Sequence, residues 1–80
     1  MRLPRDLSGK DLVQALTSLD YEITRQTSSH IRLTTQQNGE HHVTIPQHDP
    51  LLVGTLSSIL ADVAEHFQLT REELSARIFA

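Results

Sequence analysis

Two runs of alternating apolar and polar residues, joined at an Asn-Gly pair, constrain the fold of this chain most strongly. In the run 30–34 (HIRLT) and the run 42–45 (HVTI) every second residue is apolar. Side chains of a strand point alternately to its two faces, so each run predicts a strand with one buried face and one polar face. His30 and Arg32 then share the polar face of the first strand.

The register of the two strands follows from the rule that apolar residues face apolar residues when one side of a sheet is buried. A two-residue turn at Asn38-Gly39 would place Leu33 opposite Thr44 and mix the two faces. A three-residue loop over 37–39 instead places Leu33 opposite Val43, and it puts Gly39 at the left-handed position that such loops require. We therefore predict the three-residue loop.

In this register His30 lies opposite Pro46, near one end of the strand pair. His42 lies four residues along the ladder, roughly 13 Å away at ~3.3 Å per residue, so it is not a direct partner of His30. If the strand direction continues past Pro46, His48 falls diagonal to His30, on the order of 7 to 8 Å away on the same face. Two imidazoles at that spacing would flank one phosphate.

Apolar spacing and capping residues predict the rest of the chain. The further elements are a helix from about Gly9 to Leu19 capped by Ser8 and Asp11, a short strand at 21–24, a helix opening at Gly54-Thr55, and a short helix capped by Thr70 and Glu73. The order α-β-β-β-α-α predicts an α+β fold, in which a three-stranded antiparallel sheet carries helices on one face and leaves the other open. His30 is expected on the open face.

Length and composition limit the class of protein. Eighty residues make one domain, 1–80, with a single small core. The chain has no cysteine, no apolar segment typical of a signal peptide and none of membrane-spanning length, so we expect an intracellular, cytoplasmic protein without a membrane partner. A formal net charge of −3 argues against tight, general binding of nucleic acid.

The basic residues nevertheless gather in the first half of the chain, which allows a local basic patch beside His30. They are Arg2, Arg5, Lys10, Arg25 and Arg32. Solvated surface charges are the simpler interpretation of each of them. The same holds for His30 itself, since a single outward histidine on a strand is a common surface residue.

The functional interpretation of His30 is general acid or base chemistry. An exposed imidazole with an ordinary pKa near ~6.5 exchanges protons at neutral pH, as cleavage of an RNA phosphodiester by its own 2′-hydroxyl requires. Arg32, two residues along on the same face, would stabilise charge on the phosphorane oxygens. A metal site is the rival, because the chain holds five histidines. His41 and His42 point to opposite faces of a strand and do not close on one ion, so we expect no metal and no other cofactor.

Several separated motifs, in the right order, resemble one known family. They are LSGKDLVQAL, YEITRQ, SSHIRL, HHVTIPQH and PLLVGTLSSILADVAEH. Over nearly its whole length the chain is similar to HicA-type mRNA interferase toxins, the YcfA-like family. The resemblance implies a fold like that of double-stranded-RNA-binding domains, cleavage of mRNA without a metal, and neutralisation by a HicB-type antitoxin.

The resemblance also implies the site. The catalytic histidine of the family, in a Gly-Ser-His motif on the second strand, corresponds to His30. Ser28 and Ser29 of this motif, and Arg32 from its place on the face of His30, are expected as RNA-binding or site-edge residues. The family's Pro-x-His element corresponds to Pro46 and His48, which makes His48 a site-edge residue. Ser28 stands where the family usually has glycine. If that glycine needs a positive φ or a close approach of RNA, serine costs on the order of 1 kcal/mol or blocks the approach.

A competing function is recognition of duplex RNA without cleavage. Duplex-binding domains of this fold place lysines at the start of the last long helix, whereas the segment 54–58 reads GTLSS. A nuclease that acts on single-stranded message needs less charge and more precise placement. The resemblance therefore implies a toxin endoribonuclease that cuts mRNA and arrests translation, and the missing lysines agree with this expectation.

Overall fold

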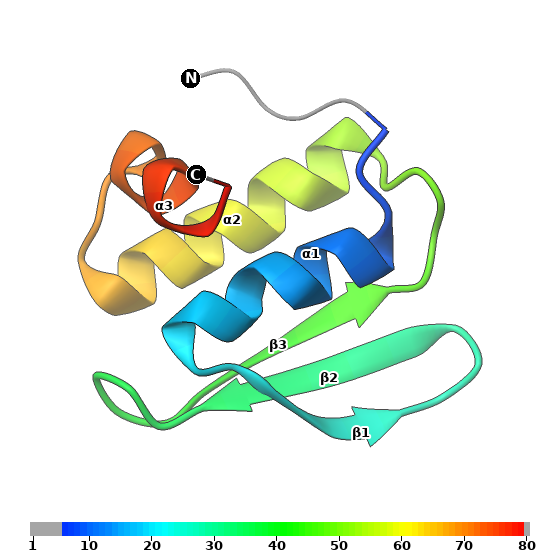
Figure 1. Cartoon of the computed structure of the whole chain (residues 1–80), viewed down its shortest axis with the longest axis horizontal. Helices are drawn as coiled ribbons and strands as arrows, with labels where there is room; N and C mark the ends of the chain where they lie inside the picture. The colour runs from blue at the N-terminus through cyan, green and yellow to red at the C-terminus, as the bar shows by residue number, and fades with distance from the viewer. Residues whose placement is uncertain (1–5, 80) are drawn as a thin grey trace.

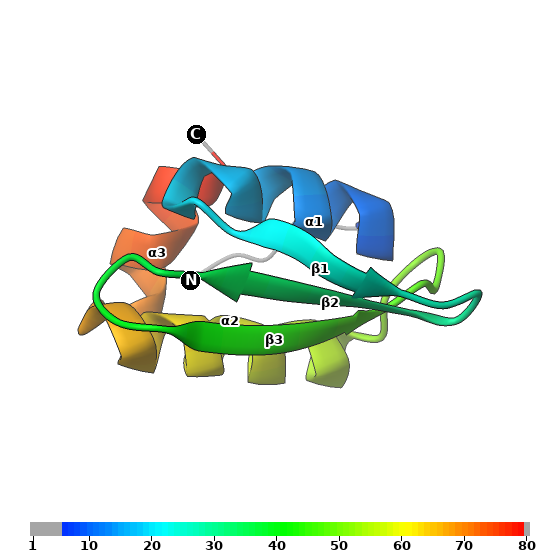
Figure 2. The ribbon, with the colours of Figure 1, turned by 90° about the horizontal axis from the view of Figure 1, so that it is seen from below.

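The computed structural model describes residues 6–79, which form a three-stranded antiparallel sheet with helices on one side (Figure 1). The elements are α1 (Gly9–Leu16), η1 (Thr17–Leu19), β1 (Glu22–Gln26), β2 (His30–Thr35), β3 (His41–Pro46), α2 (Val53–Phe67) and α3 (Arg71–Ile78). The strand order is β1-β2-β3, and α1 and α2 both contact β3. Figure 2 shows the opposite face of the sheet, and no helix among residues 6–79 covers this face. The predicted α+β architecture and element order are confirmed.

The β2–β3 pair has the register that apolar matching predicts. Leu33 pairs with Val43, and His30 pairs with Pro46. Regular pairing ends at Thr35, and Gly39 has a φ of +95° in the connecting loop. Because apolar partners stand opposite each other, one face of both strands is buried and the other is exposed.

β1 carries a bulge that simple alternation does not predict. Ile23 pairs with Leu33, yet the next pair joins Arg25 to Arg32, so Thr24 is an extra residue. A bulge sets two residues of one strand against one residue of its neighbour and re-aims the side chains that follow. Arg25 therefore lies on the same open face as Arg32.

The helix ends differ from the prediction by a few residues. α1 ends at Leu16, and the last predicted turn, Thr17–Leu19, is a 3₁₀ helix that a left-handed residue, Asp20, terminates. The first strand begins at Glu22 and not at residue 21. α2 begins at Val53, ahead of the predicted Gly54-Thr55 start.

Both predicted capping boxes are present. Ser8 and Asp11 cap α1, and Thr70 and Glu73 cap α3, each through reciprocal hydrogen bonds between side chain and backbone. The caps satisfy donors that the first helical turn leaves without partners. Apolar side chains of the sheet and helices meet in one core, whose fully buried members include Leu12, Leu16, Leu33, Ile45, Leu60, Val63 and Leu74.

Gly9 holds the start of α1 tightly against the segment that leaves β3. A Cβ at this position would lie 2.3 Å from the Pro46 carbonyl oxygen and 3.2 Å from Gln47 Cα. The Gly9 N–H donates to the His48 carbonyl at 2.9 Å. Only glycine permits this approach, which sets the direction of the chain after β3.

Candidate functional site

His30 is the first residue of β2 and stands beside the turn from β1. Its N–H donates to Thr27 Oγ1 at 3.1 Å, and its carbonyl accepts from the Thr27 N–H at 2.9 Å. The Thr27 hydroxyl thus closes the turn and fixes the backbone of His30. The side chain is exposed on the open face.

The His30 imidazole is oriented by the preceding residue. Ser29 Oγ lies 2.9 Å from His30 Nδ1, within hydrogen-bond distance. A hydroxyl can donate to Nδ1 or accept from it, so this contact suits either protonation state of the ring. Within residues 6–79, no hydrogen bond occupies Nε2, so that nitrogen is open to a bound molecule.

Two arginines lie further along the open face from this imidazole. Arg32 follows His30 by two residues on β2, and the bulge sets Arg25 directly opposite Arg32 on β1. Both side chains are exposed, and no ion pair among residues 6–79 neutralises either one. Like charges directly opposite each other destabilise a sheet, whereas a bound anion would relieve their repulsion.

The open face is acidic at its other end. Glu22 pairs with Thr34, and Glu40 follows the hairpin loop. Hydrogen bonds from Gln36 and then His42 lower the pKa of Glu40, which keeps its carboxylate charged. The face therefore changes from positive beside His30 to negative beside Glu22.

Ser28 does not need the backbone freedom of glycine. Among residues 6–79, a positive φ occurs only at Asp6, Asp20, Asn38, Gly39 and Gln68. The strain expected for a left-handed serine is therefore absent. Ser28 is exposed in the turn before Ser29, so its side chain faces solvent beside the candidate site.

His48 does not continue the strand. β3 ends at Pro46, so the condition for a position diagonal to His30 is not met. His48 lines a cavity of about 250 Å³ beside the start of α1, together with Ser8, Gly9, Lys10, Gln47 and Asp49. The link to the site is indirect, because the Gln47 N–H donates to the Ser29 carbonyl at 2.8 Å.

Three other histidines have structural partners. His42 lies on the open face, 2.7 Å from the Thr34 hydroxyl and 3.1 Å from Glu40. His41 lies 2.7 Å from the Tyr21 hydroxyl, and its ring stacks on that of His66 at 4.3 Å. The His41–His66 stack depends on how α2 lies over the hairpin, so the sequence alone does not reveal it.

Tyr21 and Asp62 complete this stacked cluster. His41 Nε2 lies 3.3 Å from Asp62 Oδ1. Burial, and then the charge of Asp62, raise the pKa of Tyr21. His66 also lies 2.9 Å from the Gln37 carbonyl, so the cluster ties the hairpin loop to the end of α2. We interpret this cluster as a structural contact between the hairpin loop and α2, and not as a second functional site.

The part of the chain that the structure describes holds no group of three or more histidine, aspartate and glutamate side chains placed to bind a metal ion. Arg2 and Arg5, expected to add to the basic patch, lie outside the described residues. Lys10, also expected in the patch, lines the cavity that His48 lines. Among the residues that the structure describes, Arg25 and Arg32 lie on the open face with His30.

Comparison with known protein families shows to which family this chain belongs. The family model described as the HicA toxin of bacterial toxin-antitoxin matches residues 9–64, more than half of the chain. The chain belongs to the HicA toxin family. Searches of curated proteins and of solved structures found no significant match. The HicA match spans α1, the sheet and most of α2, and so includes His30 and both arginines.

Membership in the HicA family implies a toxin that is paired with an antitoxin. No helix among residues 6–79 has both the length and the apolar character of a membrane span. In this HicA toxin the candidate site is therefore the open face of the sheet, with His30 at its basic end.

Proposed function

We propose that this chain is a toxin endoribonuclease that cuts mRNA, with His30 as its general acid or base. The observation that carries the proposal is the exposed His30 imidazole, held by Ser29 and flanked by Arg32 on a sheet face that the helices leave open. The HicA family match supports the toxin role. Such an enzyme would act in the cytoplasm, where message is translated.

The chemistry needs no group beyond the RNA, the imidazole and water. Neutral His30 takes the proton of a ribose 2′-hydroxyl, and the 2′-oxygen attacks the adjacent phosphorus. The bond from phosphorus to the 5′-oxygen then breaks. The imidazolium or a water molecule returns a proton to that oxygen, which leaves a 2′,3′-cyclic phosphate and a free 5′-hydroxyl.

The arginines supply the electrostatic part of this proposal. Charge develops on the nonbridging phosphate oxygens as the pentacoordinate phosphorane forms. Arg32 lies on the same face as His30, and Arg25 lies opposite Arg32. Their guanidinium groups suit a phosphate because each presents several N–H donors in a fixed plane. Two local cations also explain how a chain with a net charge of −3 would hold RNA.

The antitoxin is proposed to cover the open face and shield His30. A HicB-type protein that contacts Arg32 and the edge residue His48 would exclude RNA from the site. The Arg32→Ala variant should then bind the antitoxin more weakly, and the His48→Ala variant should escape inhibition by it. An interface confined to α2 and α3 would contradict this arrangement.

The test is cleavage of a single-stranded RNA by the purified protein in a strong chelator. Cut product ending in a cyclic phosphate supports the proposal, and activity that is lost with the chelator and restored by a metal overturns its metal-free chemistry.

The first turn of α2 carries no lysine or arginine, which speaks against a duplex-binding module. A shifted band on duplex RNA without cut product would favour that module.

A further inference from the structure

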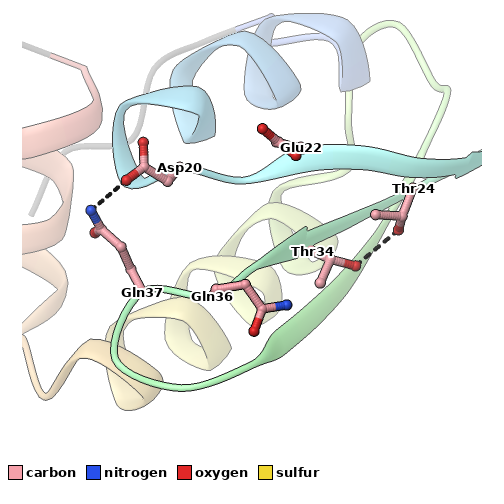
Figure 3. A pocket seen from close by; sticks show the side chains of 6 residues that line it. All are labelled: Asp20, Glu22, Thr24, Thr34, Gln36 and Gln37. Carbon is pink, nitrogen blue, oxygen red and sulfur yellow. Dashed lines mark hydrogen bonds between the residues drawn. The ribbon is translucent and has the colours of Figure 1, made fainter.

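A polar groove lies on the open face at the end away from His30 (Figure 3). Its volume is about 410 Å³, and it is lined by Asp20, Glu22, Thr24, Thr34, Gln36 and Gln37. The Thr24 and Thr34 hydroxyls share a hydrogen bond of 2.8 Å across β1 and β2. The groove therefore combines hydroxyl, amide and carboxylate groups in one place.

The groove is partly organised by contacts among its own side chains. The Gln37 amide donates to the Asp20 carboxylate, as Figure 3 shows, and the Gln36 amide donates to Glu40 at 3.2 Å. Glu22 differs from these residues, because its carboxylate makes no hydrogen bond or ion pair within residues 6–79. Both oxygens of Glu22 are therefore open to a ligand in the groove.

We propose that this groove binds a nucleobase with an exocyclic amino group, from the same single-stranded RNA whose phosphate lies at His30. The inference rests on the proposed function and adds to it a site for base recognition. Carboxylates at Glu22 and Asp20 repel the RNA backbone but accept from amino groups, as acidic side chains accept from cytosine N4. Uracil presents a carbonyl oxygen at position 4, where cytosine presents its amino group, and the carboxylates repel that oxygen.

The two ends of the open face fit one bound strand. His30 and Thr34 lie on the same face of β2, roughly 13 Å apart at ~3.3 Å per residue, with Arg32 between them. Phosphates are attracted to the end with Arg25 and Arg32, and the acidic end accepts only the donor edge of a base. This charge difference gives the strand a position and a direction on the sheet.

Binding and cleavage are measured separately, so that base recognition by the groove and the proposed nuclease activity are tested independently. Binding is measured by fluorescence anisotropy with a His30→Ala protein, which does not cut its ligand under the proposed function. The probes are labelled single-stranded oligocytidylate and oligouridylate, whose bases differ in the amino or carbonyl group at position 4 and in the proton that uracil carries on N3. We expect oligocytidylate to bind about ten-fold more tightly, within the range for hydrogen bonds that read a base.

The matched variants are Glu22→Gln and Glu72→Gln. The amide at residue 22 offers a donor as well as an acceptor, so the preference for cytidylate should fall to within about three-fold. Glu72 is exposed on α3, away from the sheet, and its amide should leave the preference unchanged. Three results would contradict base recognition by the groove: equal affinities for the two probes, a preference that survives Glu22→Gln, or no RNA binding at all. If the wild-type protein does not cleave RNA, the proposed nuclease activity is contradicted, but the base preference is not.

Discussion

Arg25 lies directly opposite Arg32 across β1 and β2, on the face of the sheet that carries His30. A like-charged pair in this position costs roughly 0.2–1 kcal/mol relative to small neutral residues. The bulge at Thr24 creates the pair, because regular alternation would have turned Arg25 to the other side. A bound anion at this point would relieve the repulsion between the two guanidinium groups.

The Arg25→Ala variant should be more stable and less active than the wild type. Removing one charge relieves the repulsion at Arg32, so the free energy of unfolding should rise by up to about 1 kcal/mol. RNA affinity should fall, and the slope of log affinity against log salt should shrink by about 0.7 for one lost phosphate contact. Urea unfolding and binding titrations over a salt series measure both. Arg77→Ala on α3 is the control, and an unchanged slope for Arg25→Ala would show that Arg25 does not touch the phosphate.

The Ser29→Ala variant should slow cleavage without weakening RNA binding. Ser29 Oγ holds His30 Nδ1 at 2.9 Å, so its loss frees the ring to rotate away from the productive orientation. We expect a roughly ten-fold lower kcat, a similar KM and partial recovery in Ser29→Thr, which keeps the hydroxyl. An equal loss in Ser29→Ala and Ser29→Thr would contradict a role for this hydrogen bond.

Acid should destabilise the protein partly through the cap of α3. Hydrogen bonds from the Thr70 backbone, and then from its hydroxyl, lower the pKa of Glu73 from its ordinary value of 4.5. A carboxylate with a depressed pKa stabilises the fold fully above pH 4.5, and this contribution is lost as the pH falls through the lower, folded value. Thermal unfolding at pH values from neutral down to about 3 should show a smaller fall for Glu73→Gln than for the wild type. Parallel curves for the two proteins would be inconsistent with this linkage.

The contribution of Thr70 to the α3 cap can be tested at neutral pH. Thr70→Ala removes the hydroxyl that accepts from the Glu73 N–H at 3.0 Å. The loss of an N-cap hydroxyl of this kind typically costs about 1 kcal/mol. Urea unfolding at pH 7 measures the change, and cleavage should be unaffected because α3 lies far from the open face.

The sequence predicts the parts of this fold that follow from local chemistry. Leu33 and Val43 define the register because burying one face leaves a single acceptable pairing. The caps at Ser8 and Thr70 are visible because each needs only residues three positions apart. These features place His30 on the open face before any tertiary contact is known.

The parts that depend on distant segments could not be predicted. The bulge that turns Arg25 outward leaves the apolar pattern of β1 unchanged, so no periodicity reveals it. His48 leaves the strand direction where the chain after β3 packs against Gly9, a contact between segments far apart in the chain. The stack of His41 on His66 likewise requires the position of α2 over the hairpin.

The central claim is that His30 performs the proton transfer, and a matched pair of histidine variants tests it most directly. His30→Ala and His42→Ala each remove an exposed imidazole from the same sheet face. Both proteins should fold with unfolding midpoints close to the wild type, because outward side chains contribute little to packing. The measurement is the rate at which each purified, folded protein cuts a single-stranded RNA. We predict a loss of at least about 10²-fold for His30→Ala, as removal of a general acid or base produces, and near wild-type cleavage for His42→Ala. A folded His30→Ala protein that cuts RNA at the wild-type rate would contradict the account.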